Sequence, residues 1–102
     1  MINKSALLKS AFKESKKHAY IIIEKEASIK KVKQCRLRYE IEPESKSTKG
    51  IAHYIFKVPA GYNLIEAYIH DYDVVMNSSL PIRYEIGGTF TIDFTLSFTE
   101  GD

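Results

Sequence analysis

The sequence is poor in several residue types: it holds one cysteine, three prolines, five glycines and no tryptophan among 102 residues. A single cysteine excludes an intramolecular disulfide. Histidines would have to supply almost all the other ligands of a cysteine-based zinc site. A chain with one unpaired thiol suits a reducing compartment, so we expect a cytoplasmic protein.

Long hydrophobic runs are also missing. The longest uninterrupted apolar run, residues 19–23, is far short of the roughly 18 to 20 residues that a membrane helix needs. The stretch after Met1 carries lysines and lacks an apolar segment long enough for a signal peptide. We therefore expect neither secretion nor a transmembrane segment.

What is present is an ordinary globular composition. Apolar residues make up 44% of the chain, aromatic residues 12% and charged residues 27%, which is typical of a folded rather than a disordered protein. A chain of this length buries roughly two-thirds of its unfolded surface around one core. The sequence therefore predicts a single domain over residues 1–102, without internal repeats.

The charges divide unevenly along the chain, although the net charge is only +2. Residues 1–38 hold eleven lysines and arginines against three glutamates, a net charge of +8. Residues 39–102 hold four basic residues against ten acidic ones, a net charge of −6. Such asymmetry between two halves is typical of a protein that meets a charged partner.

The N-terminal segment predicts an amphipathic helix followed by a strand. The positions that share one helical face are Leu7, Leu8, Ala11, Phe12 and Ser15. Lysines occupy the opposite face, and Asn3 stands where an N-cap residue belongs. The β-branched run 20–23 that follows is too apolar to be exposed, so we expect a short buried strand there.

Two further strands are predicted on either side of a polar loop. Apolar residues alternate from Cys35 to Ile41, and this alternation places Cys35 in the apolar row as a buried thiol. The polar loop 43–50 follows. The chain then returns as a strand over residues 51–58, which ends at Pro59.

The segment 64–76 has seven apolar positions within one helical arc, whereas strand alternation fails at Asp71 and Asp73. Asn63, followed three residues later by Glu66, resembles a capping box. The pattern therefore predicts a second helix here. If the segment is extended instead, the chain becomes a β-sandwich with one N-terminal helix.

The last part of the chain predicts a β-hairpin around Gly87. A three-residue loop over residues 87–89 lets Ile86 face Phe90, and it unites the apolar residues of both strands on one side. The predicted fold class is thus α+β, with an antiparallel sheet of about five strands, an N-terminal helix and a second helix near 64–76.

No recognisable catalytic or ligand-binding motif occurs. The three histidines, His18, His53 and His70, lack the short spacing of a metal site. The chain has no nucleophile elbow, no glycine-rich phosphate loop and no paired carboxylate motif. We therefore expect a protein that is not an enzyme, with no catalytic residues, cofactor or metal, and the sequence implies no small-molecule ligand.

The best functional candidate is the basic segment 30–38, which we expect to be largely one strand flanked by Tyr20 and Tyr39. Together with lysines of the first helix, the candidate binding residues are Lys30, Lys31, Lys33, Arg36, Arg38, Lys13, Lys16 and Lys17. Our first hypothesis is a protein that binds a protein partner, or self-associates as a homo-oligomer, through opposed basic and acidic surfaces. The alternative is a small nucleic-acid-binding domain that uses the basic strand.

Overall fold

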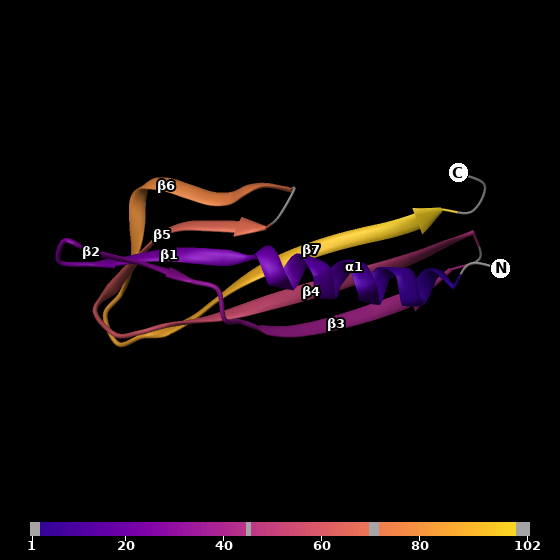
Figure 1. The fold of residues 1–102 in the computed structure, drawn as a ribbon, viewed down its shortest axis with the longest axis horizontal. Helices are drawn as coiled ribbons and strands as arrows, with labels where there is room; N and C mark the ends of the chain where they lie inside the picture. Colours follow the sequence, from indigo (N-terminus) through magenta and orange to yellow (C-terminus); the bar gives the residue numbers. More distant parts are fainter. Residues whose placement is uncertain (1–2, 45, 70–71, 100–102) are drawn as a thin grey trace.

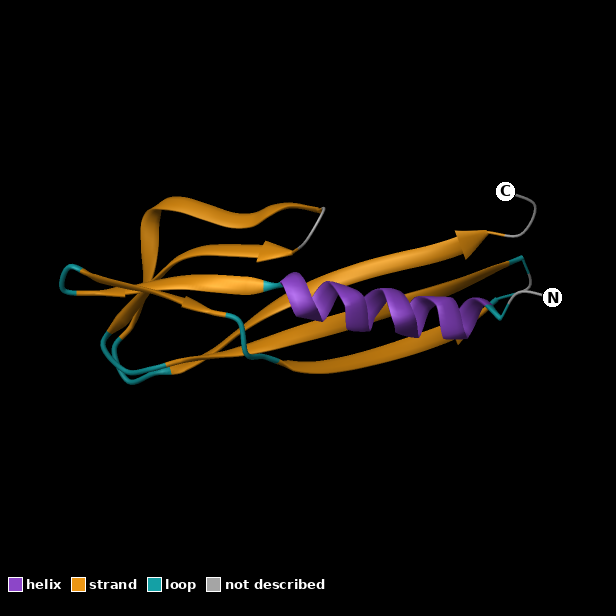
Figure 2. Ribbon diagram, viewed as in Figure 1, coloured by secondary structure: helices purple, strands orange, loops and turns teal. Residues whose placement is uncertain are grey.

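The computed structural model describes residues 3–44, 46–69 and 72–99, which form one helix and seven strands. In chain order these are α1 (Lys4–His18), β1 (Tyr20–Lys25), β2 (Ser28–Val32), β3 (Arg36–Pro43), β4 (Ser47–Val58), β5 (Tyr62–Ile69), β6 (Tyr72–Tyr84) and β7 (Gly88–Thr99). The strands form two antiparallel sheets, ordered β2-β1-β5-β6 and β3-β4-β7 (Figures 1 and 2). The predicted fold class, α+β with an N-terminal helix, is confirmed.

The helix α1 begins where the sequence predicts. The side-chain Oδ1 of Asn3 accepts a hydrogen bond of 3.1 Å from the backbone N–H of Ala6, which caps the first turn. Leu8, Phe12 and Ser15 are buried along one face. Basic residues fill the last turn, where they complement the helix dipole. No helix of the described residues is long and apolar enough to cross a membrane.

The strand β4 is the centre of the three-stranded sheet and buries one complete face. Its alternating buried residues are Thr48, Gly50, Ala52, Tyr54, Phe56 and Val58. The helix α1 packs over the first part of this face, where the Tyr54 hydroxyl donates a 3.2 Å hydrogen bond to the carbonyl oxygen of Phe12. Ile21 and Ile23 of β1 and Leu64 of β5 belong to the same buried cluster. One continuous core therefore joins the helix and both sheets.

Both sheets share one long two-stranded ribbon, because β4 continues into β5 while its neighbour β7 is preceded by β6 (Figure 1). The ribbon bends at residues 59–61 and 85–87. There the N–H of Gly61 donates a 2.8 Å hydrogen bond to the carbonyl oxygen of Tyr84. Gly87 has φ +81°, and a Cβ at this position would lie 3.1 Å from two backbone atoms of the facing segment. This corner therefore needs glycine at Gly87.

The predicted second helix is wrong, because the described parts of segment 64–76 are strands; residues 70 and 71 lie outside the described residues. On β5, Leu64 and Ala67 are buried three residues apart. Between them Ile65 has no Cα partner on β1, since the register shifts there. This β-bulge inserts one extra residue and turns a period of two into a spacing that imitates a helix. The extended alternative is the one that the structure supports.

The predicted C-terminal hairpin is also wrong. The strand β6 pairs with β5 in one sheet, and β7 pairs with β4 in the other. Ile86, which the hairpin would have faced with Phe90, lies at the corner with 93% of its surface exposed. The Gly87 bend sends the two strands into different sheets. The described residues form seven strands rather than about five, because residues 28–32 and 62–69 are strands as well.

Other predictions hold. The buried strand expected at residues 20–23 is β1, in which Ile21 and Ile23 are buried. The two strands around the polar loop are β3 and β4, and they pair directly, with Tyr39 opposite Ala52. These elements are confirmed. They could be predicted because the residue patterns that mark them lie within short stretches of sequence.

Candidate functional site

The predicted basic strand 30–38 is not one strand. The strand β2 ends at Val32 in the four-stranded sheet, and β3 begins at Arg36 in the three-stranded sheet. The chain crosses between the sheets over residues 33–35, so the basic residues are divided among three elements. Those that lie exposed are Lys30 and Lys31 on β2, Lys33 in the crossing, and Arg36 and Arg38 on β3.

Lysines of the β1–β2 hairpin lie over tyrosine rings. The Lys31 ammonium nitrogen is 4.4 Å from the centre of the Tyr20 ring. The Tyr62 ring faces two ammonium groups, with its centre 5.3 Å from that of Lys30 and 5.8 Å from that of Lys25. Cations at these distances are attracted to the ring faces. The structure therefore gives the basic hairpin the aromatic support that the sequence suggested only weakly.

Tyr20 has a second aromatic neighbour. Its ring stacks on that of Tyr68, with centres 5.1 Å apart and planes 25° apart. Burial raises the pKa of the Tyr20 hydroxyl, and the Glu66 carboxylate raises it further. Because Tyr68 and Lys31 already contact this ring, little of it remains for a stacking ligand.

The candidate lysines of the helix, Lys13, Lys16 and Lys17, are all exposed on α1. The Lys17 ammonium nitrogen lies 3.3 Å from a carboxylate oxygen of Glu14. The hydrogen bond and positive charge of Lys17 lower the pKa of Glu14, and His18 lowers it further. On an exposed helix such pairs stabilise little. These lysines lie on α1, whereas Lys30 and Lys31 lie on β2.

Cys35 is buried, as the sequence predicts, with 8% of its surface exposed. Burial raises the pKa of its thiol, an effect that the nearby positive charge of Lys16 partly offsets. A thiol with a raised pKa stays protonated near neutral pH and is a poor nucleophile. Cys35 therefore acts as a small packing residue.

A histidine–carboxylate pair lies on the outer face of the three-stranded sheet. His53 Nδ1 is 2.6 Å from Asp93 Oδ1, and Arg38 stands opposite His53 on the next strand. The sequence did not reveal this pair, since its members are far apart in the chain and meet only by strand register. Within residues 3–44, 46–69 and 72–99, no three side chains of the metal-ligating types are grouped for a metal ion, and His70 lies outside these ranges.

The outer face of β3 carries both signs of charge. Arg36 and Arg38 are followed by Glu40 and Glu42, and all four side chains are exposed on one side of the strand. The +8 and −6 halves of the sequence therefore meet within a single strand. Charge on this sheet face is mixed rather than gathered into one sign.

The strand β7 is the edge of its sheet and pairs with β4 on one side; no second neighbour of β7 occurs in the described part of the chain. Its apolar row is only partly covered. Ile92 is buried, as predicted for this row, but Phe90, Phe94 and Leu96 are half-buried and Phe98 is 36% exposed. Edge position depends on the order of strands in the sheet, which the sequence did not provide.

A pocket lies beside the crossing between β2 and β3, although the sequence implied no small-molecule ligand. Seven residues from β2, the crossing, β3, β4 and β7 line it. These segments are distant in sequence, so no local motif marks the pocket.

Comparison of the chain with protein-family models, with curated proteins and with solved structures found no match. Its function must therefore be inferred from its own surfaces.

Proposed function

We propose that this protein is a non-enzymatic, cytoplasmic interaction protein that pairs with a second copy of itself through the free edge of β7. One observation carries the proposal: among the described residues β7 has no second neighbouring strand, and its apolar row is only partly buried. An unpaired edge offers backbone N–H and C=O groups to another strand. A neighbouring copy of β7 would cover the apolar row at the same time.

The edges of the two sheets differ in how they resist pairing. Natural sheets protect edges with lysine, proline or short strands. The edge strand β2 has five residues and contains Lys30 and Lys31, and the edge strand β3 alternates charged residues and ends at Pro43. The strand β7 has twelve residues and contains no lysine, arginine or proline. The contrast with β2 and β3 supports β7 as the edge for a partner.

The sequence of β7 favours a particular antiparallel register. A two-fold axis at Phe94 would place Phe94 opposite its copy and Asp93 opposite Thr95, while the apolar row meets the apolar row. Shifting the axis to Asp93 would oppose two carboxylates, which destabilises a strand pair. Both registers pair almost the whole strand, so charge selects the axis at Phe94. The acidic group thus sets the orientation by repulsion, whereas our sequence-based hypothesis relied on attraction between opposed basic and acidic surfaces.

The register gives a test in which opposite charges have opposite effects. Thr95→Glu would place a carboxylate opposite Asp93 of the other copy twice per dimer, and we expect the dimer dissociation constant to rise about tenfold. Thr95→Lys would place an ammonium group there and should keep or strengthen the dimer. Sedimentation equilibrium over a range of protein concentrations measures both constants. The dimer should have twice the chain mass of 11.7 kDa.

Lys49→Gln is the matched control, because it also changes the net charge by one unit but lies on the central strand β4. It should leave the dissociation constant within about twofold of the wild type, since it adds no cross-strand contact at the edge. A wild-type protein that stays monomeric at about 100 μM would overturn the proposal, because a functional dimer needs a dissociation constant below this range. Equal weakening by both Thr95 variants would overturn the register.

The second candidate function is single-stranded nucleic-acid binding, favoured by the lysines over Tyr20 and Tyr62. It ranks second because the Tyr20 ring is already occupied and the basic residues are divided between two sheets. If Lys30 and Lys31 each contact a phosphate, the negative slope of log affinity against log salt should become shallower by about 0.7 for each lysine changed to glutamine. Fluorescence anisotropy with a labelled oligonucleotide measures this slope. Arg38→Gln serves as control, and an equal change with it would argue against a hairpin site.

A further inference from the structure

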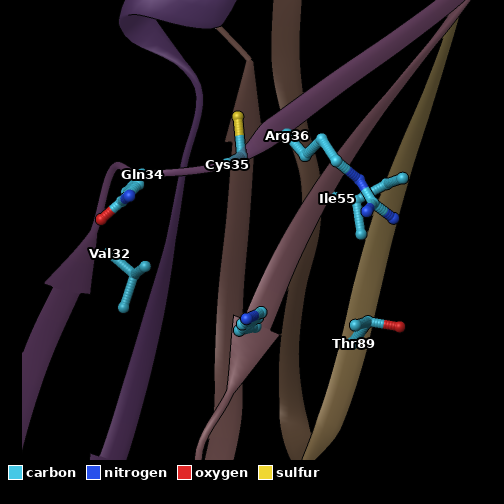
Figure 3. A pocket seen from close by; sticks show the side chains of 7 residues that line it. Val32, Gln34, Cys35, Arg36, Ile55 and Thr89 are labelled. Atoms are coloured by element: carbon cyan, nitrogen blue, oxygen red, sulfur yellow. The ribbon is translucent and has the colours of Figure 1, made fainter.

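The pocket beside the β2–β3 crossing has a volume of about 530 Å³ (Figure 3). Its lining residues are Val32, Gln34, Cys35, Arg36, Ile55, Lys57 and Thr89. This volume lies within the range of about 300 to 1,000 Å³ that is typical of small-molecule sites. The crossing forms one wall, and the outer face of the three-stranded sheet forms the other.

Every polar side chain of the pocket can donate a hydrogen bond, and its charges are all positive. Arg36 and Lys57 supply two cations, Gln34 and Thr89 supply an amide and a hydroxyl, and no carboxylate lines the pocket. Neither cation forms an ion pair with any described residue. Two unpaired cations in one pocket attract an anion.

Strand register brings these groups together. Arg36 lies directly opposite Ile55, Lys57 is two residues further along the same side of β4, and Thr89 lies opposite Lys57. Diagonal neighbours of this kind are within reach of one another's long side chains. The four residues therefore form one continuous patch, with Ile55 as its apolar part.

We propose that this pocket binds the phosphoryl group of a small phosphorylated molecule, with the apolar part of that molecule lying on Val32 and Ile55. A phosphate monoester carries about −1.5 to −2 charges at pH 7, which matches two unpaired cations. The Arg36 guanidinium fits two phosphate oxygens at once, and Lys57 neutralises the remaining charge.

Cys35 also lines the pocket, and it does not repel an anion there. Its sulfur points away from Thr89 in Figure 3, and burial raises the pKa of its thiol. The thiol therefore stays neutral at pH 7 and adds no negative charge. The inference does not depend on the proposed dimer, since the deciding charges lie on β3 and β4 rather than at the β7 edge.

The test is a titration of the wild-type protein with phenyl phosphate, followed by backbone amide chemical shifts. We expect saturable shifts at residues around the pocket. Arg36→Gln and Lys57→Gln should each weaken binding at least tenfold, because each removes charge-assisted hydrogen bonds. Both residues are exposed, so the variants should keep the fold, as far-ultraviolet circular dichroism can verify.

Matched controls lie on the same strands and the same sheet face. Arg38→Gln controls for Arg36, and Lys49→Gln controls for Lys57; neither residue lines the pocket. Both controls should bind phenyl phosphate within about twofold of the wild type, since exposed charges away from the pocket are screened. If the control variants lose as much affinity as the pocket variants, the phosphate is attracted by the overall positive charge of the surface, and the proposed site is wrong. An absence of saturable shifts up to about 10 mM would overturn it as well, since such affinity is too weak for a specific site.

Three other ligands test the chemistry of the occupant. Inorganic phosphate should bind more weakly than phenyl phosphate, because it lacks the apolar contact with Ile55, and equal affinity would overturn that contact. Benzoate should also bind more weakly, and tighter binding of benzoate would overturn the preference for a phosphoryl group. A single-stranded oligonucleotide is the third competitor. If it displaces phenyl phosphate at a total phosphate concentration below that at which phenyl phosphate itself binds, the natural ligand is nucleic acid and the proposal of a small molecule is wrong.

Discussion

The covered face of the three-stranded sheet has two halves that solve the same packing problem differently. Under the start of α1, the buried residues Gly50 and Ala52 of β4 are small, and a Cβ on Gly50 would lie 2.8 Å from the Phe12 ring. Toward the four-stranded sheet they are large and include Phe56 and Val58, which share the core with Ile23. In the helix half, packing depends on the close approach of α1 to the backbone of β4. In the sheet half, it depends on large side chains that fill the space between the two sheets. The change from Gly50 to Phe56 along one strand thus accompanies the change of the element that covers it.

The largest effect should come from removing the side chain that fills the helix half. Phe12 is completely buried and contacts the rings of Tyr39 and Phe94, with ring centres 6.1 Å apart in both pairs. We expect Phe12→Ala to lower the free energy of unfolding by about 3 to 5 kcal/mol. Urea denaturation followed by circular dichroism, at one fixed protein concentration, measures this change. Leu7→Ala, on the same helix but 45% exposed, should cost less than about 1 kcal/mol.

The same experiment tests whether the two halves unfold together. Because the core is continuous, the helix signal and tyrosine fluorescence should report one transition in the Phe12 variant. Loss of the helix signal at a lower urea concentration than the tyrosine signal would contradict a single cooperative unit.

The smaller prediction compares one methyl group in each half. Gly50→Ala adds a methyl where the Phe12 ring allows no room, and we expect it to destabilise the protein by about 1 to 3 kcal/mol. Ile23→Val removes a methyl from the sheet half and should cost about 0.5 to 1.5 kcal/mol. Equilibrium denaturation of the two variants side by side gives both values. A Gly50→Ala variant as stable as the wild type would show that the helix does not need this close approach.

The elements that could be predicted from the sequence are those with short-range signals. The Asn3 cap and the apolar face around Phe12 identified the helix, and the loop after Pro43 identified the β3–β4 pair. The bulge at Ile65 and the bend at Gly87 were missed, because both depend on which strand lies alongside. Local periodicity reports which side chains are buried but not which strand covers them.

The candidate sites also divide into features that local sequence patterns predict and features that depend on strand pairing. The exposure of Arg36 was predictable from alternation, but the separation of Lys30 and Arg36 into two sheets was not, because no turn signal marks the crossing at residues 33–35. The pocket needs Lys57 and Thr89 beside Arg36, and only strand register supplies that arrangement.

The bent ribbon of β4–β5 and β6–β7 has a consequence for how the chain folds. Its strand pairs range from Ile69 with Tyr72, which are near neighbours in the chain, to Ser47 with Thr99, which lie far apart. Contacts of large sequence separation slow folding when each must close its own long loop. Here the pairs can form in succession from the inner end, so each new pair closes only a short additional loop. We therefore expect the outer end of β7 to join its sheet late, after the corner at Gly87 has formed.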